Sequence, residues 1–330
     1  MSTVLIVVVN YRTPTLAVQC LESLEAEVGA NPGARVTIVD NDSGDGSAET
    51  IAGSITTRGW SAWARLIASP VNGGFAAGNN LAIRSALDMA EPFEFVWLVN
   101  PDAKARPGAL AELVAFMNAY PQAGIAGGGL EDGEGESWPY AFRFPSLWSE
   151  FDNGLSLGLI SRLLSSYTVA RRMGQEPEQV DWISGANFMI RRAVIDSVGL
   201  MDSGYFLYYE ETDYCLQALR AGWECWYVPS ARVCHLAGQS TGVRTDDPGR
   251  ARRPAYWFES RVRYFVRNHG RAYAAATDLL WILGTLTLRM RQVVQRKRRT
   301  YPARYLRDFI RHSVLLRPLS PCPGDQRNLW

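Results

Sequence analysis

Short apolar runs that alternate with helix-forming segments are the feature that most restricts the fold of this chain. We expect buried strands at residues 4–9, 36–39, 66–68, 95–99 and 124–126. Between them we expect three helices. The first covers 14–27, with Thr13 as N-cap and Pro14 at its first position. The second runs from the segment 72–80 to about residue 89, and the third covers 107–119. Strands that alternate with helices pair in parallel, because each crossover returns the chain across the sheet. The sequence therefore predicts an α/β fold whose mostly parallel sheet is covered by helices on both faces.

The rest of the chain continues this pattern after an interruption. Residues 130–180 are rich in Gly, Pro and aromatic residues and predict a long irregular excursion. Beyond it we expect a strand and a helix within 182–199, a helix over 211–221 ended by Gly222, and two short strands within 225–238. From about residue 247 the chain is helical and basic. We therefore place a domain boundary near residue 245, between a domain of residues 1–245 and a C-terminal region of residues 246–330.

Composition excludes some classes of function. The 330 residues carry a formal net charge of +1, which argues against a dedicated nucleic-acid binder. The five cysteines form no CxxC pair, and the apolar run at 4–9 is too short for a signal peptide and lacks a preceding basic segment. We therefore expect a protein of the reducing cytoplasm.

Acidic residues follow two of the expected strands, where ligands bind in parallel sheets. "VDNDSGDGS" (39–47) places Asp40 and Asp42 just beyond a strand, where a carboxylate can accept hydrogen bonds from a nucleobase or ribose. A solvated turn is an equally good interpretation of this motif alone. A calcium loop counted from Asp40 is excluded, because its sixth and twelfth positions are Asp45 and Ile51 instead of Gly and Glu. "NGGFAAGNN" (72–80) permits a tight turn at a helix start, although a plain loop explains it as well.

A divalent-metal site is suggested by two residues far apart in the sequence. "LVNPDA" ends a strand and leaves Asp102 at its carboxyl end, where a lone Asp after Pro is more often a turn residue. "VCHLAG" leaves His235, one of only three histidines, at the end of a later strand. Imidazole and carboxylate together suit Mn²⁺ or Mg²⁺, with phosphates and water completing the coordination shell.

Crowded acids mark the start of the helix expected near residue 211. "YFLYYEETDYC" places Glu210, Glu211 and Asp213 after an apolar, aromatic approach. Charge at a helix N-terminus explains one or two acids. Acids in apolar surroundings are also candidates for a raised pKa and for general-base catalysis.

Taken together, seven segments resemble an inverting glycosyltransferase of family 2 with the GT-A fold, and the resemblance covers about residues 3–242. The segments are "VVVNYRT", "VDNDSGDGS", "NGGFAAGNN", "LVNPDA", "ISGANFMIRR", "GYFLYYEETDYCLQALRAGW" and "HLAGQST", in this order. The chain is most similar to bacterial rhamnosyltransferase-like enzymes that build cell-surface polysaccharides.

The resemblance implies a role for each of these residues. Donor-side residues would be Asp40 at the nucleobase, with Asp42 beside it, and Tyr11 and Asn79 bordering the nucleotide pocket. Asp102 would be the last Asp of the family's DXD motif, and Asn100 stands where the motif has its first Asp. Both residues would face the donor. Asp102 and His235 would be the metal ligands. Glu211 would be the general base, with the choice between Glu210 and Glu211 left open, and Asp213 would orient the acceptor. Trp182, Gly185 and Ala186 would line the acceptor side.

The resemblance also implies the reaction and its partners. A sugar would pass from a nucleotide-diphosphate donor, with dTDP-rhamnose as our guess, to a glycan or polyprenyl-diphosphate-linked acceptor, with Mg²⁺ or Mn²⁺ as cofactor. Two alternatives are a sugar nucleotidyltransferase, whose glycine-rich basic loop is missing from "NYRTPT", and a non-catalytic nucleotide-sugar or glycan-binding module. Homo-oligomerisation is left open.

The C-terminal region suggests a membrane surface as a further partner. "AYAAATDLLWILGTLTL" (272–288) is apolar but interrupted by Asp278 and shorter than a spanning helix. The basic segment "RMRQVVQRKRRTYPARYLRDFIRH" follows it directly. We expect a helix that lies on the anionic inner face of the cell membrane. The alternative is a helix packed on the catalytic domain with a solvated charged face.

Overall fold

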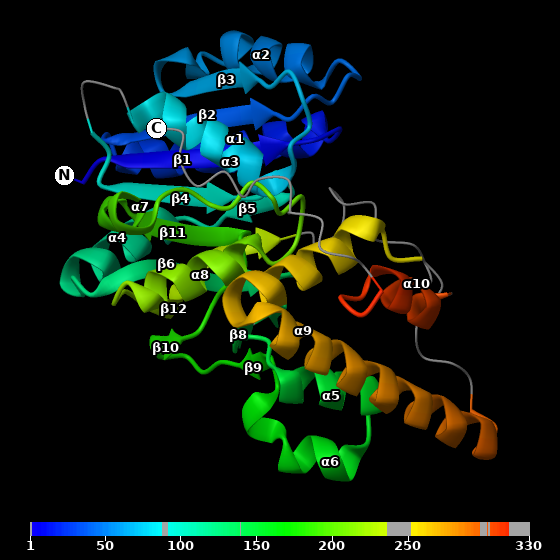
Figure 1. The fold of residues 1–330 in the computed structure, drawn as a ribbon. Coiled ribbons are helices and arrows are strands. Elements are labelled where there is room, and N and C mark those ends of the chain that lie inside the picture. Colours follow the sequence, from blue (N-terminus) through cyan, green and yellow to red (C-terminus); the bar gives the residue numbers. More distant parts are fainter. Residues whose placement is uncertain are drawn as a thin grey trace.

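A computed structural model describes residues 2–87, 92–138, 140–235, 252–297, 302 and 304–316. Its centre is a mixed sheet with the strand order β10-β12-β6-β11-β4-β1-β2-β3 (Figure 1). The first four strands in the chain pair in parallel: β1 Val4–Asn10, β2 Ala34–Asp40, β3 Ala64–Ala68 and β4 Phe95–Val99. β11 (Asn187–Arg191) is antiparallel to both its neighbours, and β12 (Glu224–His235) is again parallel to β6 (Ala123–Glu131).

Minor strands extend this sheet at its edges. β10 (Glu178–Val180) pairs with β12, as does β5 (Ala103–Ala105), and β7 (Ser137–Trp138) pairs with β6. β8 (Tyr140–Phe142) and β9 (Ala170–Arg172) form a separate two-stranded sheet. The same excursion contains α5 (Leu147–Leu155), α6 (Gly158–Leu163) and the 3₁₀ turn η2 (Ser165–Tyr167).

Helices cover both faces of the sheet because side chains alternate along its strands. On β1, Val4, Ile6 and Val8 join one apolar cluster, whereas Leu5, Val7 and Val9 join another. The first cluster includes side chains from α1 (Pro14–Ala30), α2 (Ser47–Thr57) and α4 (Ala109–Ala119). The second includes α3 (Gly74–Leu87), α7 (Arg192–Val198) and α8 (Glu210–Arg220). This layering confirms the predicted α/β fold.

The structure departs from the predicted elements in several places, and the excursion predicted as irregular contains the helices α5 and α6. α2, followed by the 3₁₀ turn η1 (Trp60–Ala62), was not expected, since its small and polar residues give a weak apolar pattern. The helix expected from residue 107 begins at Ala109, because Gly108 adopts a left-handed conformation (φ 86°). The two short strands expected after residue 224 are one strand, β12, whose register shifts between Val228 and Val233.

The C-terminal region packs on the rest of the molecule. α9 (Ala255–Val294) bends at Gly270 (φ 83°, ψ 167°), and its second half extends past the sheet alongside α5 (Figure 1). Arg261 of α9 is buried between Glu150 of α5 and Asp278 of α9, at 2.8 and 2.5 Å. α10 (Tyr305–His312) packs against α9 through Phe309 and Trp281, whose rings stack. The predicted boundary near residue 245 lies outside the described residues.

Within the described parts of the chain, no helix has both the length and the apolar character needed to cross a membrane.

Candidate active site

The predicted site residues gather at one edge of the sheet because the strands end in register. Asn10 at the end of β1 pairs with Asp40 at the end of β2. Val99, the last residue of β4, pairs with Asn187, the first residue of β11. The loops that follow β1, β2 and β4, and the loop that precedes β11, therefore share the carboxyl-terminal edge where ligands bind in such sheets.

Asp40 organises the loop after β2. Its buried carboxylate accepts hydrogen bonds from Asn10 Nδ2 (2.7 Å) and Ser43 Oγ (2.6 Å) on Oδ1, and from the Ser43 backbone N–H (3.2 Å) on Oδ2. Asp42 is exposed and lies at φ 57°, a left-handed conformation that is uncommon for residues other than glycine. A contact of Asp40 with a nucleobase stays a prediction, and Oδ2 retains capacity to accept a further hydrogen bond.

The loop after β1 faces the Asp40 loop. Arg12 also has a left-handed backbone (φ 57°); its Nε donates to the Ser43 carbonyl at 3.0 Å and its guanidinium lies 5.0 Å from the centre of the Tyr11 ring. Tyr11 is therefore held beside the predicted nucleotide pocket. Arg12 and Asp42 thus have left-handed backbones on two facing loops, and such uncommon backbone angles are typical of functional loops.

The glycine-rich segment 72–80 begins α3 and touches the loop that precedes α8. Gly74 lies at φ 85°, and a Cβ atom there would stand 2.0 Å from the carbonyl oxygen of Phe206. The next residue, Phe75, donates its backbone N–H to that carbonyl at 2.9 Å. Asn79 is buried in α3, and its side chain donates to the Phe75 carbonyl. Its predicted position at the border of the nucleotide pocket stays a prediction. Glycine is needed at residue 74 for both space and conformation.

Asn41 joins two of these loops and escaped the sequence analysis. Its buried side chain donates to Asn72 Oδ1 (2.9 Å) and to the Gly74 carbonyl (3.1 Å). Asn10 and Ser43, which hold Asp40, were missed as well. The only signal for these residues was their position within segments already singled out at strand ends.

Strand pairing brings Asp102 and His235 together. β5, which starts at Ala103, pairs with the end of β12 so that Ala103 is opposite His235. His235 Nε2 consequently lies 3.2 Å from Asp102 Oδ1 and 3.2 Å from Asn100 Nδ2. Asp102 is 2% exposed.

This donor set fits a divalent cation in part. A carboxylate and an imidazole converge, and both are ligands that Mn²⁺ accepts, but in the described residues no group of three or more His, Cys, Asp or Glu side chains gathers around one point. A cation held here would need further oxygen ligands, which a diphosphate and water supply. The role of Asp102 and His235 as metal ligands stays a prediction that their geometry accommodates.

Glu210 and Glu211 differ in what they face. Glu210 is 3% exposed, whereas Glu211 is only partly buried and lies against the loop before β11. A Cβ atom added at Gly185 would stand 3.8 Å from Glu211 Oε1, whereas Glu211 Oε2 is buried without a hydrogen-bond partner among the described residues. Preceding them, Tyr208 and Tyr209 have left-handed backbones (φ 71° and 69°) that set the approach to α8.

Burial raises the pKa of both glutamates. Desolvation is the larger cause for Glu210, and the neighbouring charge of Glu211 adds to it, so its pKa lies well above the ordinary value. Desolvation also raises the pKa of Glu211, while backbone hydrogen bonds partly oppose the shift. A carboxyl group with a raised pKa that opens toward a loop is suited to accept a proton from a bound hydroxyl.

The predicted acceptor side lies next to Glu211. Trp182 stacks on Phe142 with ring centres 4.2 Å apart, and its Nε1 donates to the Arg143 carbonyl at 2.9 Å. Gly185 is tightly packed, because an added Cβ would meet the Phe75 ring at 3.1 Å and the ring would have to move. Ala186 is buried behind it. The loop of residues 182–186 therefore forms a wall that runs from Glu211 to the donor-side segment at Phe75.

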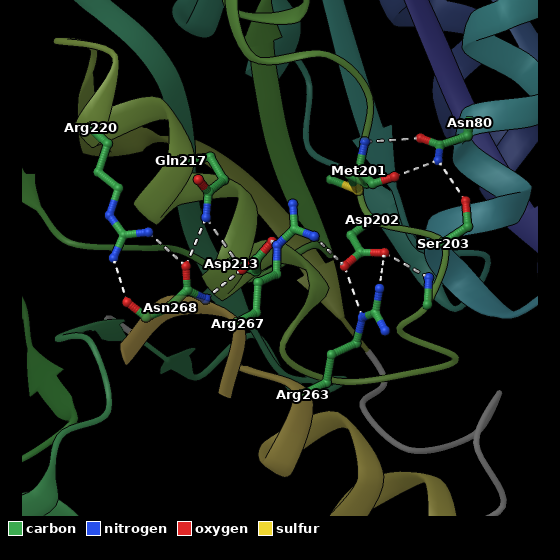
Figure 2. A network of polar contacts seen from close by, with 11 residues as sticks. Asn80, Met201, Asp202, Ser203, Asp213, Gln217, Arg220, Arg263, Arg267 and Asn268 are labelled. Carbon is green, nitrogen blue, oxygen red and sulfur yellow. Dashed lines mark hydrogen bonds and ion pairs between the residues drawn. The ribbon is translucent and has the colours of Figure 1, made fainter. Parts of the chain in front are cut away.

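Asp213 faces α9 instead of this wall (Figure 2). Its buried carboxylate accepts from Asn268 Nδ2 at 2.6 Å and lies 3.6 Å from Arg267 Nε. Burial raises its pKa, and the Asn268 hydrogen bond and Arg267 oppose the shift. The predicted influence of Asp213 on the acceptor would therefore be indirect.

The same network continues to α3 and ties α9 to the loop that precedes α8 (Figure 2). Arg263 forms a two-pronged ion pair with Asp202, with both distances 2.8 Å. The next residue, Ser203, and the Met201 carbonyl accept hydrogen bonds from the Asn80 side chain of α3. The first half of α9 therefore fixes the loop that leads into Glu210 and Glu211.

Solved structures with a similar fold define the class of this protein. GalNAc-T7 with UDP, GalNAc and Mn²⁺ superposes with a TM-score of 0.56 at 15% identity, covering 84% of this chain and 51% of that chain. The mannosyltransferase PcManGT from Pyrobaculum calidifontis, in complex with GDP-Man and Mn²⁺, gives 0.56 at 15% identity, covering 89% and 74%. The fold is that of GT-A glycosyltransferases.

Sequence comparison identifies the family. Residues 2–253 match the family described as "Glycosyltransferase like family 2", and the chain belongs to this family. N-acetylglucosaminyl-diphospho-decaprenol L-rhamnosyltransferase of Mycobacterium tuberculosis is 30% identical over 269 residues, covering 79% of this chain and 83% of the relative. Rhamnosyltransferase WbbL of Escherichia coli is 26% identical over 167 residues, covering 50% and 61%. The predicted family and its rhamnosyltransferase-like character are confirmed.

Proposed function

We propose that this glycosyltransferase is an inverting enzyme that moves rhamnose from a nucleotide-diphosphate donor such as dTDP-rhamnose to a polyprenyl-diphosphate-linked sugar in cell-surface polysaccharide synthesis. The rhamnosyltransferases among its relatives support the sugar and the kind of acceptor. The observation that carries the mechanism is the position of Glu211, whose carboxyl group opens toward the Gly185 loop at the same sheet edge as Asp102 and His235.

The proposed reaction is a single displacement. Glu211 accepts the proton of the acceptor hydroxyl while that oxygen attacks the anomeric carbon, and the bond from that carbon to the leaving diphosphate breaks on the opposite face. One such displacement inverts the anomeric configuration. Asp102 and His235, with Asn100 beside them, would hold a divalent cation that neutralises the charge growing on the diphosphate.

A donor screen tests this proposal. Purified protein is incubated with Mn²⁺ or Mg²⁺, a panel of nucleotide sugars and a short-chain polyprenyl diphosphate that carries N-acetylglucosamine. We expect transfer from dTDP-rhamnose, a product with inverted anomeric configuration by NMR, and a loss of about 10²–10⁴-fold in Glu211→Gln. Release of pyrophosphate from a nucleoside triphosphate and a sugar phosphate would instead establish the nucleotidyltransferase alternative. Donor binding without turnover would establish the binding module.

We further propose that the enzyme acts as a peripheral protein at the cytoplasmic face of the membrane, through the second half of α9. This half-helix carries apolar side chains on both faces, since Ala274, Trp281 and Leu288 are buried in it. Polar side chains are buried against α5 and α10, among them Thr277, Asp278 and Thr285. Large apolar side chains are exposed on the outer face: Leu279, Leu283, Leu286, Met290, Val293 and Val294. Exposed apolar side chains at helical spacing form a continuous stripe.

Charge makes an anionic bilayer the occupant that best fits this stripe. Arg289 and Arg291 lie in the last turns of the same helix and Arg296 and Lys297 directly follow it, and basic residues near an anionic membrane contribute about 1 kcal/mol each. An apolar helix face flanked by arginine and lysine is typical of helices that lie in the membrane interface.

Vesicle sedimentation tests the membrane proposal. Wild-type protein should sediment with vesicles of phosphatidylglycerol, and less with phosphatidylcholine. Met290→Glu combined with Val293→Glu should abolish sedimentation, since these side chains are 72% and 78% exposed and do not support the fold. Leu219→Glu, at an exposed apolar position on α8, is the matched control. Unchanged sedimentation of the double variant, or a dimer in solution that the double variant disrupts, would overturn the proposal.

A further inference from the structure

A cavity with a charged lining lies outside the strand-end site, between the start of α9 and α10. Its volume is about 490 Å³, and its charged lining consists of Arg252, Arg253, Arg311, His312 and Asp308. Phe258 forms part of its apolar lining and stacks on the His312 ring with centres 5.4 Å apart. Three arginines and one carboxylate make this cavity cationic.

The carboxylate of this cavity is already paired. Arg252 donates to both oxygens of Asp308 at 2.7 Å, and this two-pronged contact lowers the pKa of Asp308. His312 Nδ1 lies 3.6 Å from Glu259 Oε1. Arg253 and Arg311 form no ion pair with any residue that the structure describes. Two guanidinium groups thus line a cavity whose single carboxylate is already paired with a third arginine of the lining, Arg252.

The helix segment that lines the cavity also contacts the loop that precedes α8 and the proposed base. Tyr256, three residues beyond Arg253, has its ring 5.2 Å from Phe206 and 6.2 Å from Tyr208. Ser260 Oγ donates to the Leu207 carbonyl at 3.0 Å. α10 and the start of α9 lie toward the carboxyl ends of the parallel strands (Figure 1). A molecule in the cavity would therefore be a neighbour of the segment that runs into Glu210 and Glu211.

Paired guanidinium groups select phosphate oxygens. Each can donate two parallel N–H bonds to a phosphate, which an ammonium group does not do. The donor's diphosphate is assigned to the Asp102 and His235 side, at the ends of β4 and β12. The cavity on α9 and α10 is therefore placed for a second phosphate-bearing molecule.

We propose that Arg253 and Arg311 bind the diphosphate of the lipid-linked acceptor, so that its sugar hydroxyl reaches Glu211 while its polyprenyl chain leaves toward α9. This inference rests on the proposed function, because it assumes an acceptor with a diphosphate. It assigns to the C-terminal helices a role in choosing the acceptor: a sugar without the diphosphate lacks the contacts that hold it.

Steady-state kinetics with two acceptors test the assignment. One acceptor is N-acetylglucosamine on a short-chain polyprenyl diphosphate, and the other is an alkyl glycoside of the same sugar without phosphate. Arg253→Gln and Arg311→Gln should each raise KM for the diphosphate acceptor by about tenfold, with KM for the donor and kcat nearly unchanged. Neither variant should alter the weaker reaction with the glycoside. Arg307→Gln, an exposed arginine of α10 outside the cavity lining, is the matched control and should behave like wild type.

Three results would overturn the assignment or separate it from the proposed function. Unchanged KM for the diphosphate acceptor in both cavity variants, with an active wild type, overturns it. Loss of vesicle sedimentation in these variants without a change in that KM also overturns it, because the cavity would then hold a lipid headgroup. If the wild type transfers no sugar, the proposed function fails, and calorimetric binding of the diphosphate acceptor decides: tight binding to wild type that both variants weaken supports the cavity, and equal binding refutes it.

Discussion

Two adjacent glutamates with different surroundings are the most informative residues of the site. Glu210 is buried, whereas Glu211 opens toward Gly185. The charge of Glu211 adds to desolvation in raising the pKa of Glu210, so Glu210 is the carboxyl group of the pair that holds its proton to higher pH. Its burial keeps Glu210 away from a bound acceptor, which leaves Glu211 as the proposed base.

This division of roles predicts opposite effects of two isosteric substitutions. Glu211→Gln should remove most of the activity. Glu210→Gln should keep most of the activity and leave the acidic limb of the rate profile in place, because Glu210 holds its proton to higher pH and carries no charge while Glu211 titrates. Initial rates between pH 4 and pH 9 measure this; an acidic limb that moves to lower pH in Glu210→Gln would show that Glu210 is charged and raises the pKa of Glu211.

Stability should respond to the same substitution with a defined sign. The pKa of Glu210 is higher in the folded than in the unfolded state, so its favourable contribution is complete below the unfolded value and is lost as pH rises through the folded value. Glu210→Gln should therefore be more stable than wild type at neutral pH and lose this advantage in acid. Urea unfolding at pH 4 and pH 8 measures the difference.

The Asp102 and His235 pair predicts how the enzyme depends on metal. Asp102→Ala should abolish metal-dependent transfer, since a carboxylate ligand is lost. Asn100→Ala should weaken it by about 10–100-fold, as expected for a residue that orients a ligand. Activity titrated with Mn²⁺ distinguishes the two, because only Asn100→Ala should recover at high Mn²⁺. Full activity of Asp102→Ala would refute the metal assignment.

At this scale the sequence predicts charged residues better than neutral ones. Asp102, His235 and Glu211 could be found because a charge at the end of an apolar strand or before a helix is unusual. Asn10 and Asn41 could not, since a buried amide is defined by its hydrogen-bond partners, which lie on other loops. The cavity at Arg253 and Arg311 escaped although both residues are charged, because two arginines 58 positions apart become neighbours only when α10 folds onto α9.

Among the elements, the start of α3 is constrained both by its backbone conformation and by a close contact. Its first residue, Gly74, combines a left-handed backbone with contact to the Phe206 carbonyl, so it links the donor-side loop to the loop before α8. Gly46, at the start of α2, has nearly the same backbone angle (φ 84° against 85°), but a Cβ atom added there would meet no other atom within 4 Å. A substitution at Gly46 therefore tests the cost of the left-handed backbone alone, and a substitution at Gly74 tests that cost together with the steric clash.

Substituting each of these glycines by alanine should give different losses. Gly46→Ala should cost about 1–2 kcal/mol for the left-handed backbone alone. Gly74→Ala should cost more and reduce activity, because the Phe206 carbonyl must move and the Phe75 hydrogen bond is disturbed. Urea unfolding and transfer rates measure both variants; equal losses would show that the Phe206 contact adapts freely.

Elements with strong apolar runs could be predicted, and those defined by tertiary contacts could not. The parallel strands β1 to β4 follow directly from the residue pattern. α2 escaped because most of its surface is exposed and only Ser47, Ile51 and Ile55 are buried. β12 looked like two strands because Pro229 interrupts its pattern, whereas pairing with β6 on both sides of the register shift keeps it continuous.

For the molecule as a whole, the buried charge cluster around Arg261 joins the C-terminal helices to the α5 excursion. Arg261 is 2% exposed, it donates to Glu150 and Asp278, and its guanidinium lies 4.6 Å from the centre of the Phe309 ring. Asp278 also accepts the backbone N–H of Val314 at 2.8 Å. One side chain therefore connects α5, both halves of α9 and the segment after α10.

Removing this guanidinium should destabilise the protein strongly. Arg261→Met should lower the free energy of unfolding by about 3–5 kcal/mol, because two carboxylates stay buried without their partner. Arg58→Met, which removes an exposed pair with Glu22, should cost at most about 1 kcal/mol. Urea unfolding compares the two. A small loss in Arg261→Met would mean that water reaches the cluster.

The bend of α9 at Gly270 has a consequence for the geometry of catalysis. Its backbone angles lie in a region that is essentially restricted to glycine, so this one residue sets the angle between the two halves of the helix. The first half is bonded to the loop before Glu211, and the second presents its apolar stripe outward. With that stripe on a bilayer, the proposed base stands at a fixed height above the lipid headgroups. The enzyme would then select acceptors by the distance of their free hydroxyl from the membrane, and would extend only lipid-linked sugars whose hydroxyl lies at that height.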